Sequence, residues 1–282
     1  MDSRMETTIA GVTWKNPVTT AFGTFGSGRE YGELIDLNRL GAITVKGVSE
    51  EAWKGNPVPR LAETQSGLLN SIGLQNAGAE LFIENDIPFL RQYDTKIIVN
   101  ICGHTLSQYC AVAERFADCD IDMLELNISC PNVEEGGLSF GTDPHVVERV
   151  VKAVRNYVKQ PLIVKLSPEV TDITEIARAA VSGGADALSL INTLRGMKID
   201  IHKRKPILAN KIGGYSGPGI MSVALRMAYE VCHSVDVPVI GMGGISTFED
   251  ALQFIMAGAE AVAVGTANFH NPYATVEIID GI

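Results

Sequence analysis

The feature that most constrains this chain is a series of short apolar runs that alternate with segments of helical pattern. Several runs are almost continuous in Val, Ile and Leu, which is typical of strands covered on both faces. Such strands belong to parallel sheets with helices between them. The predicted strands are Val18–Ala21, Ala42–Lys46, Ile97–Ile101, Met123–Leu126, Leu162–Leu166, Ala187–Ile191, Val239–Gly241 and Ala261–Val264.

Helical segments occupy the spaces between these strands. Asp172 and Ser246 are predicted N-caps, and glycines such as Gly183 and Gly258 end helices. No Gly-x-Gly-x-x-Gly follows the first strand, as an open dinucleotide-binding sheet would require. Eight strands therefore favour an α/β fold of the closed kind, a single (β/α)8 TIM barrel over residues 1–282. The predicted helices are Ser107–Ala117, Pro144–Val158, Ile173–Ser182, Ile220–Ser234 and Thr247–Ala257.

Three connections are longer than a barrel needs: Gly47–Gly78, Asn127–Thr142 and Asn192–Gly219. All three start at the C-terminal end of a strand, the face on which barrels carry their active sites. They are therefore predicted walls of a site. The last helix, beginning near Tyr273, is expected to be shortened.

Composition excludes several classes of partner. The net charge is −10, so phosphate backbones and anionic lipids are repelled, and neither nucleic acid nor a membrane is expected. No apolar run is long enough to span a bilayer, and no secretory signal is recognisable, which favours the cytoplasm. The five cysteines form no Cys-x-x-Cys pair and are expected to be small buried thiols, and the five histidines show no metal-ligand spacing. No metal site is therefore predicted.

Glycines cluster where the seventh and eighth strands end. Gly243 and Gly244 follow the seventh strand, and Gly265 with Thr266 follows the eighth. Glycine allows backbone N–H groups to approach a ligand closely, and these two loops of a barrel commonly hold a phosphate. The glycines could also serve only as tight turns, but both loops together favour a phosphate site.

Two lysines and a set of asparagines stand near predicted strand ends. Lys46 and Lys165 end or lie within apolar strands, where an ammonium is costly unless a partner compensates it. Each could instead extend its ammonium into water, but the pair favours an anionic ligand such as a reduced flavin. Several amides on one face suit a planar polar ligand, although each could simply cap a loop. The asparagines are Asn70, Asn100, Asn127, Asn132 and Asn192.

Cys130 begins the long connection after the fourth strand. Pro131 restricts it to an extended conformation, which fixes the direction of its side chain. A thiol can accept a proton if its surroundings assist. Most single cysteines are structural, and only the neighbouring Asn127 and Asn132 favour a catalytic role here.

Together these motifs resemble the class 1 dihydroorotate dehydrogenases, from about Asn16 to the end of the chain. The resemblance implies a barrel that binds FMN and oxidises dihydroorotate to orotate: a base removes the C5 proton, and C6 passes a hydride to the flavin. The motifs are Asn127–Asn132, Leu69–Asn76, Val164–Pro168, Ile191–Thr193, Gly213–Pro218 and Gly241–Gly244.

The resemblance also assigns roles residue by residue. Cys130 matches the catalytic base. The residues that match substrate contacts are Lys46, Asn70, Ser71, Ile72, Gly73, Leu74, Asn127, Asn132, Asn192 and Thr193. Those that match flavin contacts are Lys46, Asn100, Asn127, Lys165, Ile191, Gly217, Gly243, Gly244, Gly265 and Thr266.

Within class 1, Gly73–Asn76 with its Gln75 is similar to the B type. That type implies a homodimeric core and an electron-transfer subunit that carries FAD and an iron–sulfur cluster and reduces NAD. One departure is Phe22, where relatives usually have serine. The alternatives are a dihydropyrimidine dehydrogenase-like flavin domain and a flavin-binding barrel subunit without catalysis. A tRNA-dihydrouridine synthase is disfavoured by the acidic balance.

Overall fold

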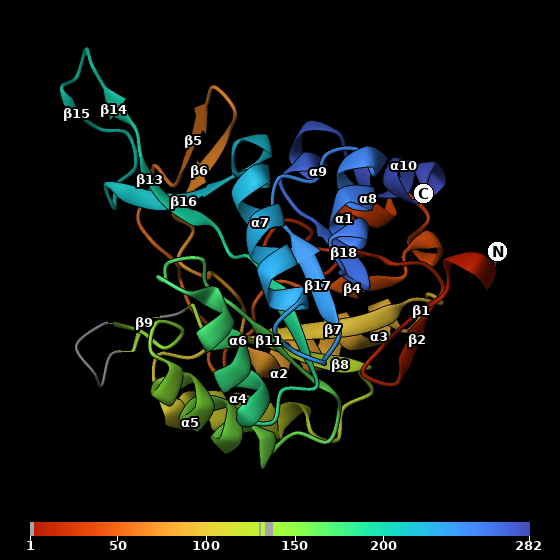
Figure 1. The fold of residues 1–282 in the computed structure, drawn as a ribbon. Coiled ribbons are helices and arrows are strands. Elements are labelled where there is room, and N and C mark those ends of the chain that lie inside the picture. Colours follow the sequence, from red (N-terminus) through yellow and green to blue (C-terminus); the bar gives the residue numbers. More distant parts are fainter. Residues whose placement is uncertain (1–2, 130, 133–137) are drawn as a thin grey trace.

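The computed structural model describes residues 3–129, 131–132 and 138–282. Its centre is a closed barrel of eight parallel strands in the order β11-β12-β17-β18-β3-β4-β7-β8 (Figure 1). The predicted (β/α)8 barrel is therefore confirmed, and each barrel strand overlaps its predicted segment. The barrel strands are β3 (Val18–Thr20), β4 (Ala42–Thr44), β7 (Lys96–Ile101), β8 (Met123–Asn127), β11 (Leu162–Lys165), β12 (Ala187–Leu190), β17 (Val239–Met242) and β18 (Ala261–Val264).

Helices surround the barrel and pack apolar faces on it. In α5, for example, the Asp143 carboxylate caps the first turn, Pro144 occupies the first helical position, and four valines at helical spacing are buried. The helices are α1 (Arg29–Gly32), α2 (Ala79–Leu81), α3 (Ile87–Leu90), α4 (Leu106–Phe116), α5 (Pro144–Arg155), α6 (Ile173–Ser182), α7 (Met221–Cys232), α8 (Phe248–Met256), α9 (Ala267–His270) and α10 (Ala274–Gly281). Single turns of 3-10 or π geometry are η1 (Ser3–Met5), η2 (Leu37–Arg39), η3 (Phe82–Asp86) and η4 (Pro218–Ile220).

Three local predictions can be compared with the structure. Asp172 caps α6 as predicted. The prediction of Ser246 as the cap of α8 is wrong by one residue, because Thr247 and Asp250 form a capping box there. Of the described cysteines, Cys102 is buried, whereas Cys110, Cys119 and Cys232 are partly exposed, which corrects the expectation for those three.

The barrel interior changes from apolar to polar along its axis. At the N-terminal end, apolar side chains pack against Ile9 and Trp14 of a hairpin formed by β1 (Thr7–Ile9) and β2 (Val12–Trp14). Two residues further along the strands, on the same face, the side chains are polar and buried. These are Thr44, Asn100, Glu125, Lys165 and Ser189. The polarity of the interior therefore rises toward the C-terminal mouth.

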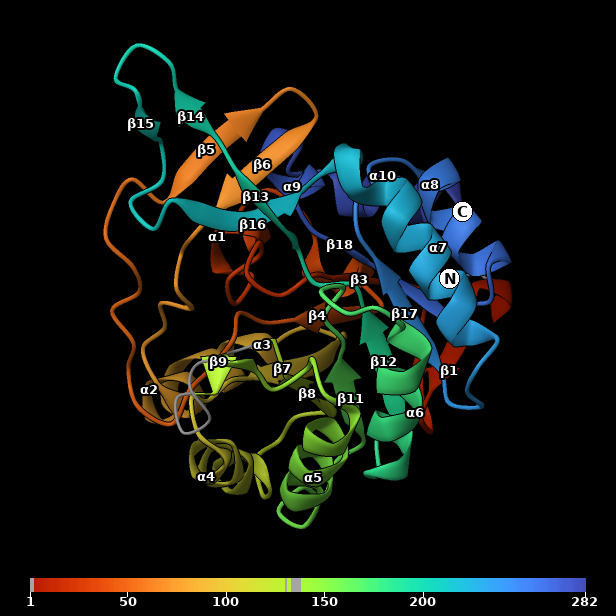
Figure 2. The same cartoon turned by 60° about the vertical axis from the view of Figure 1, so that its left-hand side comes forward.

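A four-stranded antiparallel sheet lies at the mouth, in the order β13-β16-β6-β5 (Figure 2). It joins two of the long connections, because β6 pairs with β16 across a large separation in sequence. The sequence predicted these connections only as walls, and their strands were missed. The strands outside the barrel are β5 (Leu61–Thr64), β6 (Gly67–Asn70), β9 (Pro131–Asn132), β10 (Leu138–Ser139), β13 (Leu194–Met197), β14 (Ile199–Asp200), β15 (Lys205–Pro206) and β16 (Ile212–Ser216).

The chain ends in a short helix, and none of the described helices is suited to crossing a membrane. α10 spans 8 residues and packs on β3 and α8. Within the part of the chain that the structure describes, no helix combines the length and the apolar character that crossing a membrane would take.

Candidate functional site

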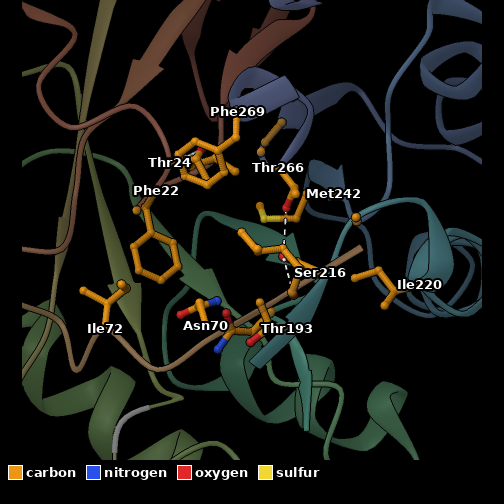
Figure 3. A pocket seen from close by; sticks show the side chains of 18 of the residues that line it. Phe22, Thr24, Asn70, Ile72, Thr193, Ser216, Ile220, Met242, Thr266 and Phe269 are labelled. Carbon is orange, nitrogen blue, oxygen red and sulfur yellow. Dashed lines mark hydrogen bonds between the residues drawn. The ribbon is translucent and has the colours of Figure 1, made fainter. Parts of the chain in front are cut away.

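A cavity of about 480 Å³ opens at the C-terminal mouth of the barrel. Its floor comes from strand ends, and its walls come from β6, β16 and the loops after β17 and β18. Figure 3 shows side chains from these separate elements arranged around one space. A volume of this size falls in the range of small-molecule sites, roughly 300 to 1,000 Å³.

The cavity brings together residues that the sequence had singled out in different motifs. Asn100 does not line it, Cys130 lies outside the described residues, and of Asn132 only the backbone is described, in β9. The predicted site residues that line the cavity are Lys46, Asn70, Ser71, Ile72, Gly73, Leu74, Asn127, Lys165, Ile191, Asn192, Thr193, Gly217, Gly243, Gly244, Gly265 and Thr266.

Lys165 is the most unusual of these residues. Its side chain is 2% exposed, and among the described residues no oxygen accepts a hydrogen bond from its ammonium. Burial lowers its pKa to about 8, and the Glu125 carboxylate acts in the opposite direction. A buried ammonium that lines a cavity and has unused donors favours an anionic or electron-rich ligand there.

Lys46 faces the same cavity from the end of β4. Burial is the larger cause that lowers the pKa of its ammonium, and the positive charge of Arg60 is the second. Two lysines and an arginine therefore share one cavity in a protein whose net charge is −10. This local concentration of cations matches the anion site that the sequence predicted.

The glycines of the site leave no room for side chains. Gly217, Gly243 and Gly244 have φ angles of 99°, 129° and 81°, in the region that favours glycine. A Cβ on Gly244 would come within 2.9 Å of the Met221 backbone. Beside them, the Thr266 hydroxyl donates to Ser216 Oγ at 2.8 Å (Figure 3). Bare backbone and hydroxyls at this wall suit a phosphate.

The amides occupy another part of the wall. Asn127 Oδ1 accepts from the Ser129 N–H at 3.1 Å, and Tyr109 donates its hydroxyl hydrogen to the Asn127 backbone carbonyl. Asn70 Nδ2 donates to the Gly214 carbonyl at 3.4 Å. The bonds to Ser129 and Gly214 orient the two side-chain amides that a flat polar ligand would meet, and the Tyr109 bond holds the backbone of Asn127.

Asn100 lies below the cavity. Its side chain is fully buried, and its Nδ2 group donates to Glu125 Oε2 at 2.6 Å. Its Oδ1 atom has no hydrogen-bond partner among the described residues. In this structure the Asn100 side chain therefore contacts Glu125 and does not line the cavity.

Comparisons with known proteins agree with this geometry. A family model described as dihydroorotate dehydrogenase matches residues 4–282. The chain belongs to the dihydroorotate dehydrogenase family. The resemblance read from the motifs is therefore confirmed.

Individual relatives in the dihydroorotate dehydrogenase family are closely similar. A protein of Alkaliphilus metalliredigens is 68% identical over 278 residues, covering 99% of this chain and 92% of the relative. One of Alkaliphilus oremlandii is 67% identical, with 97% and 91% covered, and one of Lachnoclostridium phytofermentans is 64% identical, with 98% and 92% covered. Each is named "Dihydroorotate dehydrogenase B (NAD(+)), catalytic subunit".

Several residues that line the cavity were not among the predicted site residues, and two of them, Arg60 and Phe22, bear on its charge. Arg60 lines the cavity, and its guanidinium donates to Gln75 Oε1 at 2.8 Å. Phe22 also lines it, with its ring centroid 3.9 Å from the Lys165 ammonium. Phe22 had been noted as a departure from relatives, whereas for Arg60 the only sequence signal was its position in a long connection at the mouth.

Proposed function

We propose that this chain is the catalytic subunit of a B-type dihydroorotate dehydrogenase. It oxidises dihydroorotate to orotate with FMN in pyrimidine biosynthesis, and electrons pass to NAD through a second subunit. Residues 1–282 act as one FMN-binding domain. Family membership and the cavity support this proposal.

The chemistry of the cavity walls fits FMN. The glycines 217, 243 and 244 with Ser216 and Thr266 form a wall of backbone and hydroxyl groups for the phosphate. The Lys165 ammonium suits the pyrimidine edge of the flavin ring, where negative charge increases on reduction. The volume of about 480 Å³ leaves room for a flat ring system.

Bound FMN supplies the hydride acceptor of this reaction. The chain's own residues supply position and charge: Asn70, Asn127 and Thr193 offer the hydrogen-bonding groups for the pyrimidine substrate. Lys46 adds a cation on the same side. The role of Cys130 as base rests on the resemblance, which carries a cysteine at this position.

The single observation that carries the proposal is the buried Lys165 ammonium, which lines the cavity of a family barrel without a described acceptor. The test is the absorption spectrum of the purified protein, followed by anaerobic addition of dihydroorotate. We expect a yellow protein whose flavin band bleaches with dihydroorotate and not with dihydrouracil. A protein that cannot be loaded with FMN, or that responds equally to dihydrouracil, would contradict the proposal.

The partner subunit and the location are part of the same proposal. The relatives' name specifies NAD(+) and a catalytic subunit, which supports a separate second subunit. That this subunit carries FAD and an iron–sulfur cluster, and that the core is a homodimer, rests on the resemblance of the motifs to the B type. A cytoplasmic location is proposed from the sequence, and fractionation of cells that express the chain tests it.

A further inference from the structure

A buried carboxylate lies beneath the cavity and has no role in the mechanism so far. Glu125 is on β8 and is 2% exposed. Two neutral groups donate to its two oxygens: Asn100 Nδ2 to Oε2 and Ser189 Oγ to Oε1, each at 2.6 Å. Such short bonds are typical of an ionised acceptor. A carboxylate at this depth would be very costly without compensating partners.

The strand register places this carboxylate under the lysine of the site. Asn100 pairs with Glu125 between β7 and β8, and Lys165 pairs with Asn127 and with Ser189 on the strands to either side. Glu125 and Asn127 are two residues apart on β8 and point to the same face. Glu125 therefore occupies the interior position one step below the level of Asn127, next to Lys165.

The charges around Lys165 are few. On the described elements packed against it, β8 presents Glu125, β12 presents the Ser189 hydroxyl, and the segment after β3 presents Phe22. Lys46, at the end of β4, lines the same cavity. Glu125 is the charge that opposes the effect of burial on the Lys165 ammonium.

We propose that Glu125 is a positioning residue that keeps the Lys165 side chain charged and in place at the floor of the flavin site. Asn100 and Ser189 hold the carboxylate oriented for this role, because each satisfies one of its oxygens. The inference rests on the proposed function for its meaning in catalysis. The link between Glu125 and Lys165 itself can be measured without any flavin.

The test measures the proton affinity of Lys165 in FMN-free protein. Acetic anhydride reacts with the neutral amine, so acylation of Lys165 followed by mass spectrometry against pH gives the pH of half reaction. We expect a value near 8 in the wild type and a shift downward by about one unit in Glu125→Gln, since a nearby opposite charge moves a pKa by roughly one to three units. Glu125→Asp keeps the charge, so its pH of half reaction should lie close to the wild-type value.

The matched control is Thr19→Val. Thr19 shares a 3.1 Å hydroxyl contact with Thr44 in the same buried interior but has no bond to Glu125. In Thr19→Val the pH of half reaction of Lys165 should stay at the wild-type value. If Glu125→Gln does not fold, Ser189→Ala removes one of the two bonds that hold the carboxylate and should shift Lys165 in the same direction by a smaller amount.

A second measurement tests whether the effect of Glu125 on Lys165 alters FMN binding. In a fluorescence titration of FMN-free protein with FMN, Glu125→Gln should raise the dissociation constant about fivefold at pH 8, because a pKa about one unit lower reduces the charged fraction of Lys165 there by about that factor. At pH 6 the increase should be much smaller. In a Lys165→Met background the same change should have little effect. An unshifted acylation profile in both Glu125→Gln and Ser189→Ala would overturn the inference. If the wild type binds no FMN but Glu125→Gln still shifts the acylation profile of Lys165, only the proposed function would be contradicted.

Discussion

The Lys165 ammonium lies 3.9 Å from the centroid of the Phe22 ring. Both residues line the cavity at the barrel mouth. The face of an aromatic ring carries partial negative charge, so it attracts a cation that has few other partners. Phe22 therefore stabilises the buried ammonium from one side, while Glu125 does so from the strand layer below.

Replacing Phe22 with leucine should remove this attraction and keep an apolar side chain. We expect the FMN-free protein to lose about 1 kcal/mol of unfolding free energy from the cation–π contact. The measurement is chemical denaturation of four proteins: wild type, Phe22→Leu, Lys165→Met and the double variant. The coupling energy isolates the contact from other effects of the smaller side chain.

Phe269→Leu is the control for that cycle. Phe269 lines the same cavity, but it is not the ring that covers Lys165. Its coupling to Lys165→Met should be close to zero. Equal coupling for both phenylalanines would show that the effect comes from cavity packing and not from the cation.

Stability should depend on pH through Lys165. Its pKa is lowered from 10.5 to about 8 in the folded chain, chiefly by burial. Between these values the unfolded chain binds the proton and the folded chain does not, so stability rises with pH across that window. The contribution of Lys165 is on the order of 3 kcal/mol, reached near pH 10.5 and absent below about pH 8.

The measurement is the unfolding free energy of FMN-free wild type minus that of Lys165→Met, between pH 6 and 11. This difference should be flat up to about pH 8 and then increase, because the other titrating groups cancel in the subtraction. A flat difference across the whole range would mean that the lysine keeps its ordinary proton affinity.

The barrel could be predicted from the sequence because its signal is local. Runs such as Leu162–Leu166 carry enough Val, Ile and Leu to mark buried parallel strands, and caps such as Asp172 mark helix starts. Residues at the C-terminal ends of barrel strands necessarily meet at one mouth. This is why Lys46, Asn127 and Lys165 could be assigned to one site before the structure.

The four-stranded sheet at the barrel mouth could not be predicted in the same way. β6 and β16 are short, carry glycine in their sequences, and pair across more than a hundred residues. No periodic pattern marks such strands.

The sequence also showed no sign of the bonds that Asn100 and Ser189 donate to Glu125. A glutamate within an apolar strand carries no local signal for its partners, which come here from β7 and β12.

Gly214 should control the substrate side of the cavity. A Cβ at this position would lie 2.1 Å from Thr193 Oγ1, so Gly214→Ala must displace Thr193. Thr193 is a predicted substrate contact that lines the cavity. We expect Gly214→Ala to raise the KM for dihydroorotate about tenfold, the equivalent of roughly 1 to 1.5 kcal/mol for one lost hydrogen bond, and to keep FMN bound.

Thr193→Val is the matched comparison, because it removes the hydroxyl without moving the backbone. Steady-state kinetics of Thr193→Val should also show a higher KM for dihydroorotate, with a smaller increase than in Gly214→Ala. The flavin spectrum should be unchanged in both variants. Loss of FMN from Gly214→Ala would indicate that the change disturbs the sheet between β6 and β16, not the substrate contact alone.

Cys130→Ala tests the base that the resemblance implies. We expect stopped-flow reduction of bound flavin by dihydroorotate to slow by about 10² to 10⁴, the usual contribution of a positioned general base. FMN content should remain at the wild-type level. Cys130→Ser should also be slow, since a hydroxyl is a weaker base than a thiolate. Reduction at nearly the wild-type rate in Cys130→Ala would assign this cysteine a structural role.

Reoxidation of the flavin should require a second protein. The cavity at the barrel mouth accounts for one flavin, and in the sequence no Gly-x-Gly-x-x-Gly follows the first strand. The five cysteines lack the close spacing that holds an iron–sulfur cluster. The purified barrel should therefore reduce NAD slowly with dihydroorotate, and co-expression with an electron-transfer subunit that carries FAD and an iron–sulfur cluster should raise the rate strongly.

Steady-state assays of both preparations, with fumarate as the alternative acceptor, decide between the two arrangements. Rapid fumarate turnover by the barrel alone, without any gain in NAD reduction from the subunit, would show a self-sufficient enzyme and leave the flavin chemistry of the cavity in place.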